Sequence, residues 1–409
     1  MKKAFWWILG ILLSPILLFL ILTVLLYLPP VQNWAVDKVA AIASEKTGMD
    51  ISVGYVKLAF PLDLSIDDFK MIHQPDTIAD VEQMTVDVQL LPLFKKQVVI
   101  NELEVNNTKL NTNGFVEAAQ VKGDFKRLFV SSKGIDLDHQ TVEVNGARLE
   151  DAHLDVQLND SVPEDTTTIV NLWKINIDSV VISRSDVTLH MPGDTMSVKT
   201  RFGTLTARDA LIDLGTETYT VGSVDWLNGA LAYDQNYQPR IEGLDFNHID
   251  LTNLNIGIDS IYYHDPTLRL NMRHLTLKEK SGLQVTDLSG PIVMENGSIR
   301  LPKFHLKTPE SDILVDMDMP LSLLDSIDPG KLRLRVDAQL GRQDLMRFMG
   351  DLPQSVRDRW PYYPLTVKGA VKGNMDYMEF KDLDIQLPTA FYGNADGFVA
   401  NVTDPKRLR

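Results

Sequence analysis

The sequence predicts a mainly β protein, with an N-terminal transmembrane helix, a short amphipathic helix and then an elongated, curled antiparallel β-sheet. Three observations predict this fold class. Residues 4–28 carry no charged side chain, which is typical of a membrane span. From Met49 onward, short segments alternate apolar and polar residues, as strands with one apolar face do. Asn-Gly pairs, which favour tight turns, lie between many of these segments.

The uncharged stretch at residues 4–28 is long enough to cross a membrane as one helix. At about 1.5 Å per residue, roughly 25 residues span a hydrocarbon core of about 30 Å. Lys2 and Lys3 precede the stretch, so the positive-inside rule predicts a cytoplasmic N-terminus and an extracytoplasmic remainder. A cleaved signal peptide is the alternative. It fits less well, because the apolar run is long and Pro29-Pro30 follows it instead of a small-residue cleavage site.

Residues 29–48 predict a short amphipathic helix directly after the anchor. Val31, Trp34 and Val39 recur at helical spacing, and Gly48 is placed to end the helix. This helix either caps the sheet that follows or contacts lipid directly.

The alternating segments predict strands with one apolar and one polar face. The clearest is residues 332–340, where Leu332, Leu334 and Val336 alternate with Arg333 and Arg335. The apolar alternates that we expect to line one face of the sheet are Val86, Val88, Leu90, Val187, Leu189, Leu268, Leu270, Met272, Ile313, Val315, Met317, Leu332, Leu334 and Val336.

Turn signals and one helical insertion divide these segments. We expect turns at the pairs Asn113-Gly114, Asn145-Gly146, Asn228-Gly229, Asn296-Gly297 and Asp67-Asp68, and a strand end at His264-Asp265. Residues 341–364 interrupt the alternation with a helical pattern that several prolines break up.

A degenerate repeat recurs along the chain, at residues 100–112, 144–158, 174–191 and 244–258. We interpret each copy as a strand or hairpin followed by another, which predicts a stack that extends in one dimension. If roughly 20 strands lay about 4.8 Å apart, the sheet would be on the order of 100 Å long. Such a sheet hides its apolar face in a filled sandwich, a barrel or an open trough. The residues alone do not distinguish the sandwich from the trough, and packing alone favours the sandwich.

Composition and the absence of motifs exclude several function classes. A formal net charge of −15 argues against nucleic-acid binding. The absence of cysteine excludes disulfides and a lipoprotein anchor. No metal-protease, phosphate-loop or nucleophile-elbow motif occurs, and Asp316 and Asp318 both face water at period two. We therefore predict a protein that is not an enzyme and that has no cofactor, metal or catalytic residue.

Three stretches of the sequence resemble the AsmA-like proteins, and TamB of Bacteroidetes-type bacteria in particular. They are residues 28–71, residues 81–112 and residues 351–405, where Gly369, Gly373, Gly393 and Gly397 punctuate the strands. The resemblance implies a single-pass anchor in the inner membrane and a periplasmic, groove-shaped sheet (an open groove or β-taco). It also implies phospholipid transport to the outer membrane and a role in envelope homeostasis.

The same resemblance implies an alternative function, which is the assembly or secretion of outer-membrane proteins by strand templating with a partner barrel of the BamA or TamA type. A passive envelope scaffold is a third possibility. TamB-like chains are usually longer, so we expect this chain to be part of a longer protein. The expected organisation is a cytoplasmic tip and anchor at 1–28, the juxtamembrane helix at 29–48, the groove at 49–340, the insertion at 341–364 and continuing groove at 365–409.

Overall fold

The computed structural model describes residues 40–41, 44–45, 48–59, 63–73, 75–89, 99–113, 119–136, 139–159, 172–193, 195–324, 330–348 and 354–401. Strands make up 74% of these residues, which confirms the mainly β class. The chain divides into two compact units, Met1–Val162 and Pro163–Arg409. The sequence did not indicate this division.

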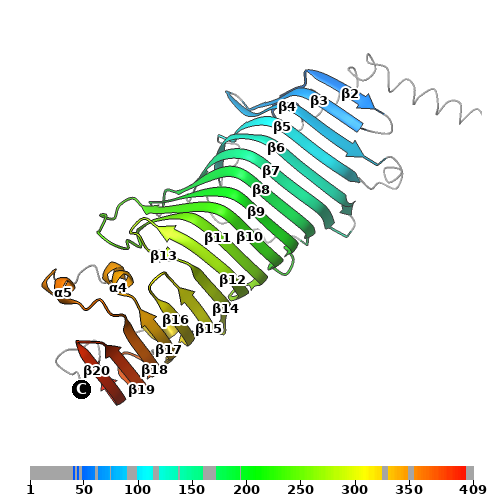
Figure 1. Cartoon of the computed structure of the whole chain (residues 1–409). Helices are drawn as coiled ribbons and strands as arrows, with labels where there is room; N and C mark the ends of the chain where they lie inside the picture. Colours follow the sequence, from blue (N-terminus) through cyan, green and yellow to red (C-terminus); the bar gives the residue numbers. More distant parts are fainter. Residues whose placement is uncertain are drawn as a thin grey trace, which may run out of the picture. The chain divides into compact units, whose positions relative to one another are not determined.

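The first unit is a meander of antiparallel strands that lie side by side in chain order (Figure 1). Its strands are β1 (Asp50–Ser52), β2 (Tyr55–Ala59), β3 (Asp63–His73), β4 (Asp76–Val88), β5 (Ile100–Asn111), β6 (Ala119–Asp136) and β7 (Thr141–Leu158). Strands β1 and β2 both pair with β3, one after the other along its length. Gly48 has a φ of 69° and its amide donates to the carbonyl of Ser44, which is the helix end predicted at this residue.

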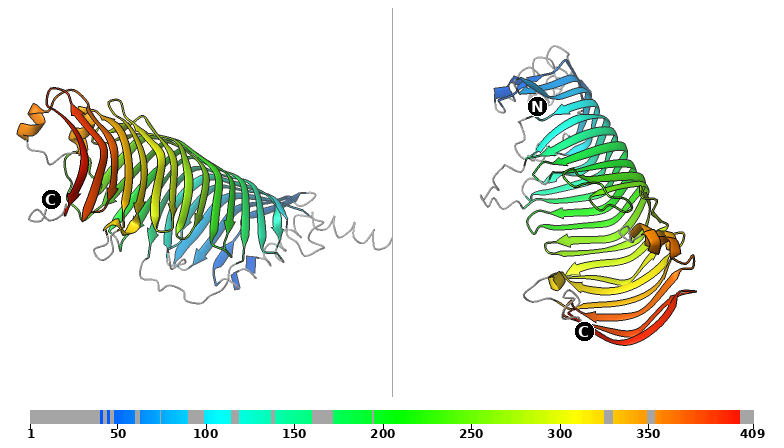
Figure 2. Two further views of the ribbon diagram at one scale, coloured as in Figure 1. Left: turned by 90° about the horizontal axis from the view of Figure 1, so that it is seen from below. Right: turned by 90° about the vertical axis from the view of Figure 1, so that its left-hand side faces the viewer.

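The second unit is also an antiparallel meander, and its sheet is curled and unclosed (Figure 2). Its strands are β8 (Lys174–Met191), β9 (Met196–Asp213), β10 (Thr218–Gln235), β11 (His248–His264), β12 (Thr267–Glu279), β13 (Gln284–Val285), β14 (Asp287–Glu295), β15 (Ser298–Lys307), β16 (Asp312–Pro320), β17 (Leu332–Leu340), β18 (Leu365–Gly373), β19 (Tyr377–Leu387) and β20 (Phe391–Ala400). Strand β12 pairs with both β13 and β14.

Three short helices lie among the described residues of the second unit. They are η1 (Leu321–Leu324), α4 (Arg342–Phe348) and α5 (Gln354–Arg359), and the last two fall in the stretch expected to be helical. Asp344 fixes α4 to the turn between β15 and β16, because its Oδ2 accepts hydrogen bonds from Thr308 at 2.5 Å and Ser311 at 2.6 Å. Its Oδ1 accepts a bond from Arg347 at 3.0 Å, so this buried carboxyl is fully used.

The predicted membrane anchor at residues 4–28 lies outside the described residues. Within the part of the chain that the structure describes, no helix has the length and apolar character needed to cross a membrane. Most of the predicted amphipathic helix also lies outside that part.

The long strands of both units are bowed along their length (Figure 2), and residues with left-handed backbone lie inside them. In the first unit these include Asp68, Asn107 and Asp151, with φ between 48° and 54°. In the second, Arg184 has a φ of 48° and Asn228 a φ of 53°. Asn and Asp tolerate this conformation because their short side chains bond locally. Such residues change the direction of a strand without ending it.

Several predicted turns are therefore wrong, because they are bends or bulges inside a strand. Asn228-Gly229 lies within β10, Asn145-Gly146 within β7 and Asp67-Asp68 within β3. The predicted turn at Asn296-Gly297 is confirmed between β14 and β15, and β11 ends at His264 as expected. Of the two alternatives expected for each repeat copy, a strand or a hairpin, the copies at 144–158 and 174–191 are single strands, because one uninterrupted strand covers each of them.

Candidate functional site

Apolar side chains of the first unit gather on one face of its sheet, and they are most buried where the strands bend. Val81, Val105, Phe125 and Ala152 come from four successive strands and form one cluster, with exposed fractions between 0% and 8%. Farther from the bend, apolar residues such as Leu103 on the same face are only half-buried. A bend crowds the side chains on its inner side, so this burial places the apolar face inside the curl.

The alternation of faces reverses at the bend, and a pair of polar residues marks the reversal on each strand. On β5, Leu103 and Val105 precede the pair Asn106-Asn107, and Thr108 and Leu110 follow it on the same apolar face. Two consecutive side chains must then point to the opposite, polar face. The outer side of a bend has room for them, which is why each pair is polar.

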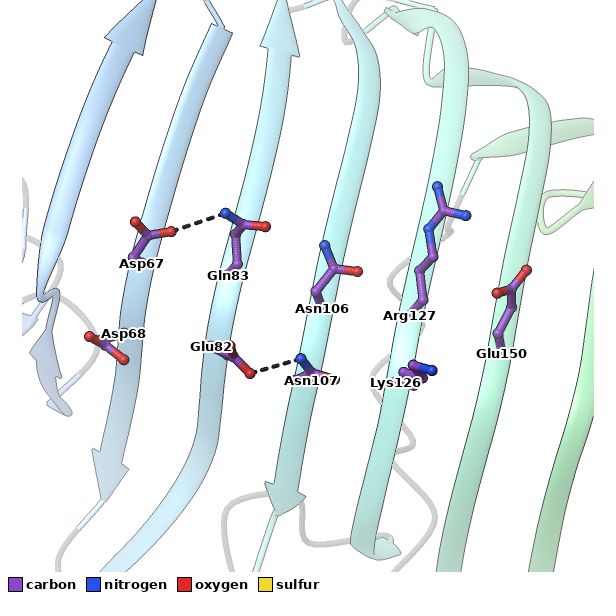
Figure 3. A pocket seen from close by; sticks show the side chains of 9 residues that line it. All are labelled: Asp67, Asp68, Glu82, Gln83, Asn106, Asn107, Lys126, Arg127 and Glu150. Carbon is purple, nitrogen blue, oxygen red and sulfur yellow. Dashed lines mark hydrogen bonds between the residues drawn. The ribbon is translucent and has the colours of Figure 1, made fainter.

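These pairs lie next to one another across five strands and form what we call the polar row (Figure 3). The row lines a shallow depression of about 560 Å³. Its members are Asp67, Asp68, Glu82, Gln83, Asn106, Asn107, Lys126, Arg127 and Glu150. Both residues of most pairs line the same depression, as the reversal of faces requires.

Hydrogen bonds connect the polar row from strand to strand (Figure 3). Gln83 donates to Asp67 at 3.3 Å, and Asn107 donates to Glu82 at 2.7 Å. Arg127 donates to Glu104 at 2.9 Å, and this bond lowers the pKa of the Glu104 carboxyl. The lining residues include no histidine, serine or threonine, so the row holds no pair of the serine–histidine type.

Strands β8 to β11 of the second unit reverse their faces twice, so each presents three apolar segments to the same side. On β10 the reversals fall at Gly222-Ser223 and Leu227-Asn228. Trp226 lies beside the second reversal, 5.2 Å from the ring of Phe202, and its indole covers Gly229. A Cβ at Gly229 would lie only 2.4 Å from the indole nitrogen, so only glycine fits there.

The structure brings many of the expected face-lining residues together across neighbouring strands. In the second unit, Val315 lies opposite Val336, and Met317 lies opposite Leu334. The expected residues with described side chains there are half-buried, except Met272, which is 9% exposed: Val187, Leu189, Leu268, Leu270, Met272, Ile313, Val315, Met317, Leu332, Leu334 and Val336.

In the first unit, Val86 lies opposite Leu64 and Leu103 on the apolar face. Leu90 and the side chain of Val88 lie outside the described part of the chain.

Sequence reasoning missed several residues of this apolar face. Leu301 pairs with Met317, and Phe304 pairs with Val315, so both continue the apolar rows of β16 onto β15. The register shifts between Leu301 and Phe304, where Lys303 has a φ of 48°, and this bend breaks the period-two pattern. On the far side, Val371 and Phe380 extend the row of Leu334 onto β18 and β19.

The polar face of the second unit carries charged side chains in pairs. Lys368 donates to Asp337 at 2.7 Å, which raises the pKa of the Lys368 ammonium, and Arg333 lies 3.4 Å from Asp318. Asp316 faces this side, opposite Arg335, as expected. No group of three His, Asp or Glu residues that could hold a metal ion occurs in the residues described.

Each unit is thus a curled, one-layered sheet with one apolar face and one charged face. Comparison of the chain with protein-family models finds no match, and comparison with curated proteins finds none either. The function must therefore be argued from the two faces themselves.

Proposed function

We propose that this chain is an inner-membrane-anchored, periplasmic protein of the AsmA-like and TamB type, and that its apolar face carries phospholipid acyl chains toward the outer membrane. In this proposal residues 4–28 are the anchor and the lipid head groups remain in water. One observation supports it above the others, which is an apolar face whose side chains stay partly exposed over many neighbouring strands.

Partial exposure separates a carrier face from a structural core. A filled sandwich buries its inward side chains almost completely. Here the buried cluster of the first unit lies at its bend, whereas Leu332, Leu334 and Val336 of the second unit keep part of their surface accessible. Such a surface is costly in water unless something apolar covers it.

The apolar rows cross the strands, which is the direction in which we propose that lipid moves. Leu301, Met317, Leu334 and Val371 form one row that crosses four strands, perpendicular to the strand direction. An acyl chain lying along such a row would meet apolar side chains without interruption. Each methylene group kept from water is worth about 0.8 kcal/mol, so a chain of ~16 carbons in water costs on the order of 10 kcal/mol. An apolar face that covers part of the acyl chain lowers this cost, and so makes the passage of a phospholipid between membranes easier.

The test compares two neighbouring residues of β17 that point to opposite faces. The full chain is purified from membranes, and its phospholipid is quantified by mass spectrometry. Leu334→Asp places a charge on the apolar face, and we expect it to remove most of the bound phospholipid. Arg335→Asp places the same group on the outer face, and we expect it to leave bound lipid unchanged. Circular dichroism and thermal melting establish that both variants fold.

Two results would contradict the proposal. One is a folded wild-type chain that carries no phospholipid. The other is equal lipid content in Leu334→Asp and Arg335→Asp, because a carrier face must distinguish the two sides of one strand.

A further inference from the structure

A small cavity lies on the charged face of the second unit, where β9, β10 and β11 meet the loop at residues 236–247. Its volume is about 210 Å³, below the roughly 300–1,000 Å³ of sites for drug-sized molecules, so it suits one small chemical group. Strand β8 pairs with β9, and β12 pairs with β11, so the cavity lies in the interior of the sheet.

The floor of the cavity consists of two rows of side chains that cross the three strands. The row nearest the strand ends contains Ser197, Asp234 and His248. In the next row, Lys199 and Asp250 lie on either side of Ala232. Neighbouring strands lie about 4.8 Å apart, so the Cα atoms of Lys199 and Asp250 are roughly 10 Å apart. Only a methyl group lies between them, which leaves room for a ligand.

The loop at residues 236–247 closes one side of the cavity and is fixed by Asp245, which is 6% exposed. Its Oδ2 accepts the amide of Ile241 at 3.1 Å and lies 2.9 Å from Nδ1 of His248. The loop also carries Arg240, which donates to Asp234 at 2.5 Å. This ion pair neutralises the carboxylate in the middle of the floor.

Two buried polar atoms of the floor have no hydrogen bond to any described residue. Ser197 is 8% exposed, and its hydroxyl has no partner there. His248 is 5% exposed, and its Nε2 lies 3.7 Å from Asp234, beyond hydrogen-bond distance. Buried polar atoms are normally satisfied, so a bound group in the cavity would supply the missing partners. Ser197 and His248 are two strands apart, with Asp234 between them, so they form no nucleophile and base pair.

The side chains that line the cavity are net positive, although the chain has a net charge of −15. The charged ones are Lys199, Arg240, Lys280, Asp234 and Asp250. Lys199 and Lys280 form no ion pair in the part of the chain that the structure describes. With Asp234 neutralised by Arg240, two ammonium groups remain against the single carboxylate of Asp250. A phosphodiester carries one negative charge, and its oxygens accept strong hydrogen bonds from ammonium and hydroxyl groups.

We propose that this cavity binds the phosphate group of a phospholipid head group. The proposal rests on the proposed function, in which the acyl chains lie on the apolar face. Val198, Tyr233 and Ile249 alternate with the floor residues and lie opposite one another on that face. A phospholipid bound across the strand ends would place its acyl chains on these three residues and its phosphate beside Ser197 and the two lysines. The cavity therefore selects lipids that carry a phosphate.

Phosphorus NMR of the delipidated full chain in maltoside micelles tests the cavity. The probes are inorganic phosphate and dihexanoyl phosphatidylglycerol, and the line broadening of each on titration gives its Kd. The double variant Lys199→Gln/Lys280→Gln should bind both probes about tenfold or more weakly, because two charge-assisted hydrogen bonds are lost. Lys303→Gln/Lys381→Gln removes the same charge elsewhere in the second unit and should bind like the wild type.

Two further variants of the same chain refine this test. Ser197→Ala removes one buried hydroxyl without adding bulk and should weaken the binding of both probes several-fold. Val198→Asp places a charge on the apolar face behind the cavity. It should weaken phosphatidylglycerol about tenfold and leave inorganic phosphate unchanged, because only the lipid has acyl chains. Circular dichroism establishes that each variant folds.

Three results would overturn the proposal, in different ways. Equal binding by the two double lysine variants would place the phosphate outside this cavity and leave the carrier function standing. A wild type that binds inorganic phosphate but not phosphatidylglycerol would refute both the carrier function and the lipid as ligand. Equal affinity for both probes, with no effect of Val198→Asp, would show that the ligand is free phosphate.

Discussion

Replacing Asn107 with valine tests whether left-handed residues in the polar row bend the first sheet. Asn107 lies inside β5 with a φ of 48°, and its side chain donates to Glu82 at 2.7 Å. Valine is β-branched and is strained in this conformation, whereas asparagine and glycine are not. If the bend depends on this backbone conformation, the valine variant must either carry the strain or straighten the strand.

The magnitude follows from two contributions. The left-handed conformation costs an ordinary residue about 1–2 kcal/mol relative to one that tolerates it. Loss of the exposed hydrogen bond to Glu82 costs about 0.5–1 kcal/mol more. Asn107→Val should therefore lose about 1.5–3 kcal/mol of local stability. Asn107→Gly loses only the hydrogen bond, so the two variants should differ by about 1–2 kcal/mol.

Hydrogen-exchange mass spectrometry of the full chain measures this difference where it arises. Local opening free energy sets the exchange rate, and every 1.4 kcal/mol is a factor of ten. Amides of β4, β5 and β6 near the polar row should exchange roughly 5–30 times faster in Asn107→Val than in Asn107→Gly. Asn106→Val changes the neighbouring residue, which has no left-handed backbone, and serves as the matched control. Equal exchange in all three variants would refute the role assigned to the left-handed row.

Three further predictions follow from packing and charge. Asp344→Ala should raise exchange in α4 while β17 stays protected, because about 2–3 kcal/mol of buried hydrogen bonding to the β15–β16 turn is lost. Phe125→Ala should cost the first unit about 3–5 kcal/mol in urea unfolding, since Phe125 belongs to its buried cluster. Glu104 has a lowered pKa in the folded chain, so its bond to Arg127 stabilises the fold above the unfolded pKa and is lost as pH falls through the folded pKa. The gap in melting temperature between wild type and Glu104→Gln should therefore be present at neutral pH and close in acid; a gap that is independent of pH would contradict this assignment.

The sequence predicted the strands wherever the alternation is unbroken. Leu332, Leu334 and Val336 share a face because nothing interrupts period two in β17, whose bounds match the predicted segment. Successive side chains of an extended strand point to opposite faces, so an unbroken alternation also shows which residues share a face.

The sequence failed where a strand reverses its faces. An Asn-Gly pair predicts a two-residue turn, yet Asn228-Gly229 lies at a bend inside β10. Both structures need a left-handed residue, and asparagine supplies it in either case. Only the partner strands decide between them, because β9 and β11 continue past the bend and pair with β10 on both sides of it. The residues of β10 alone do not determine that pairing. For the same reason, Leu301 and Phe304 of β15 could not be assigned to one face from the sequence.

The same bends explain the repeat found in the sequence. Its polar centre, such as Asn106-Asn107 in β5, is the pair that points outward at the reversal. The apolar residues on either side of that centre are the inner face of one continuous, bent strand. The sequence showed that this pattern recurs, and the structure supplies its cause.

Photo-cross-linking along β17 tests the central claim most directly. A photoreactive amino acid is placed in turn at residues 332 to 337 of the full chain in living cells, and cross-linked phospholipid is detected by mass spectrometry. We expect a period of two, with lipid attached at Leu332, Leu334 and Val336 and absent at Arg333, Arg335 and Asp337. Lipid attached at neither set, or equally at both, would contradict an apolar face that carries acyl chains.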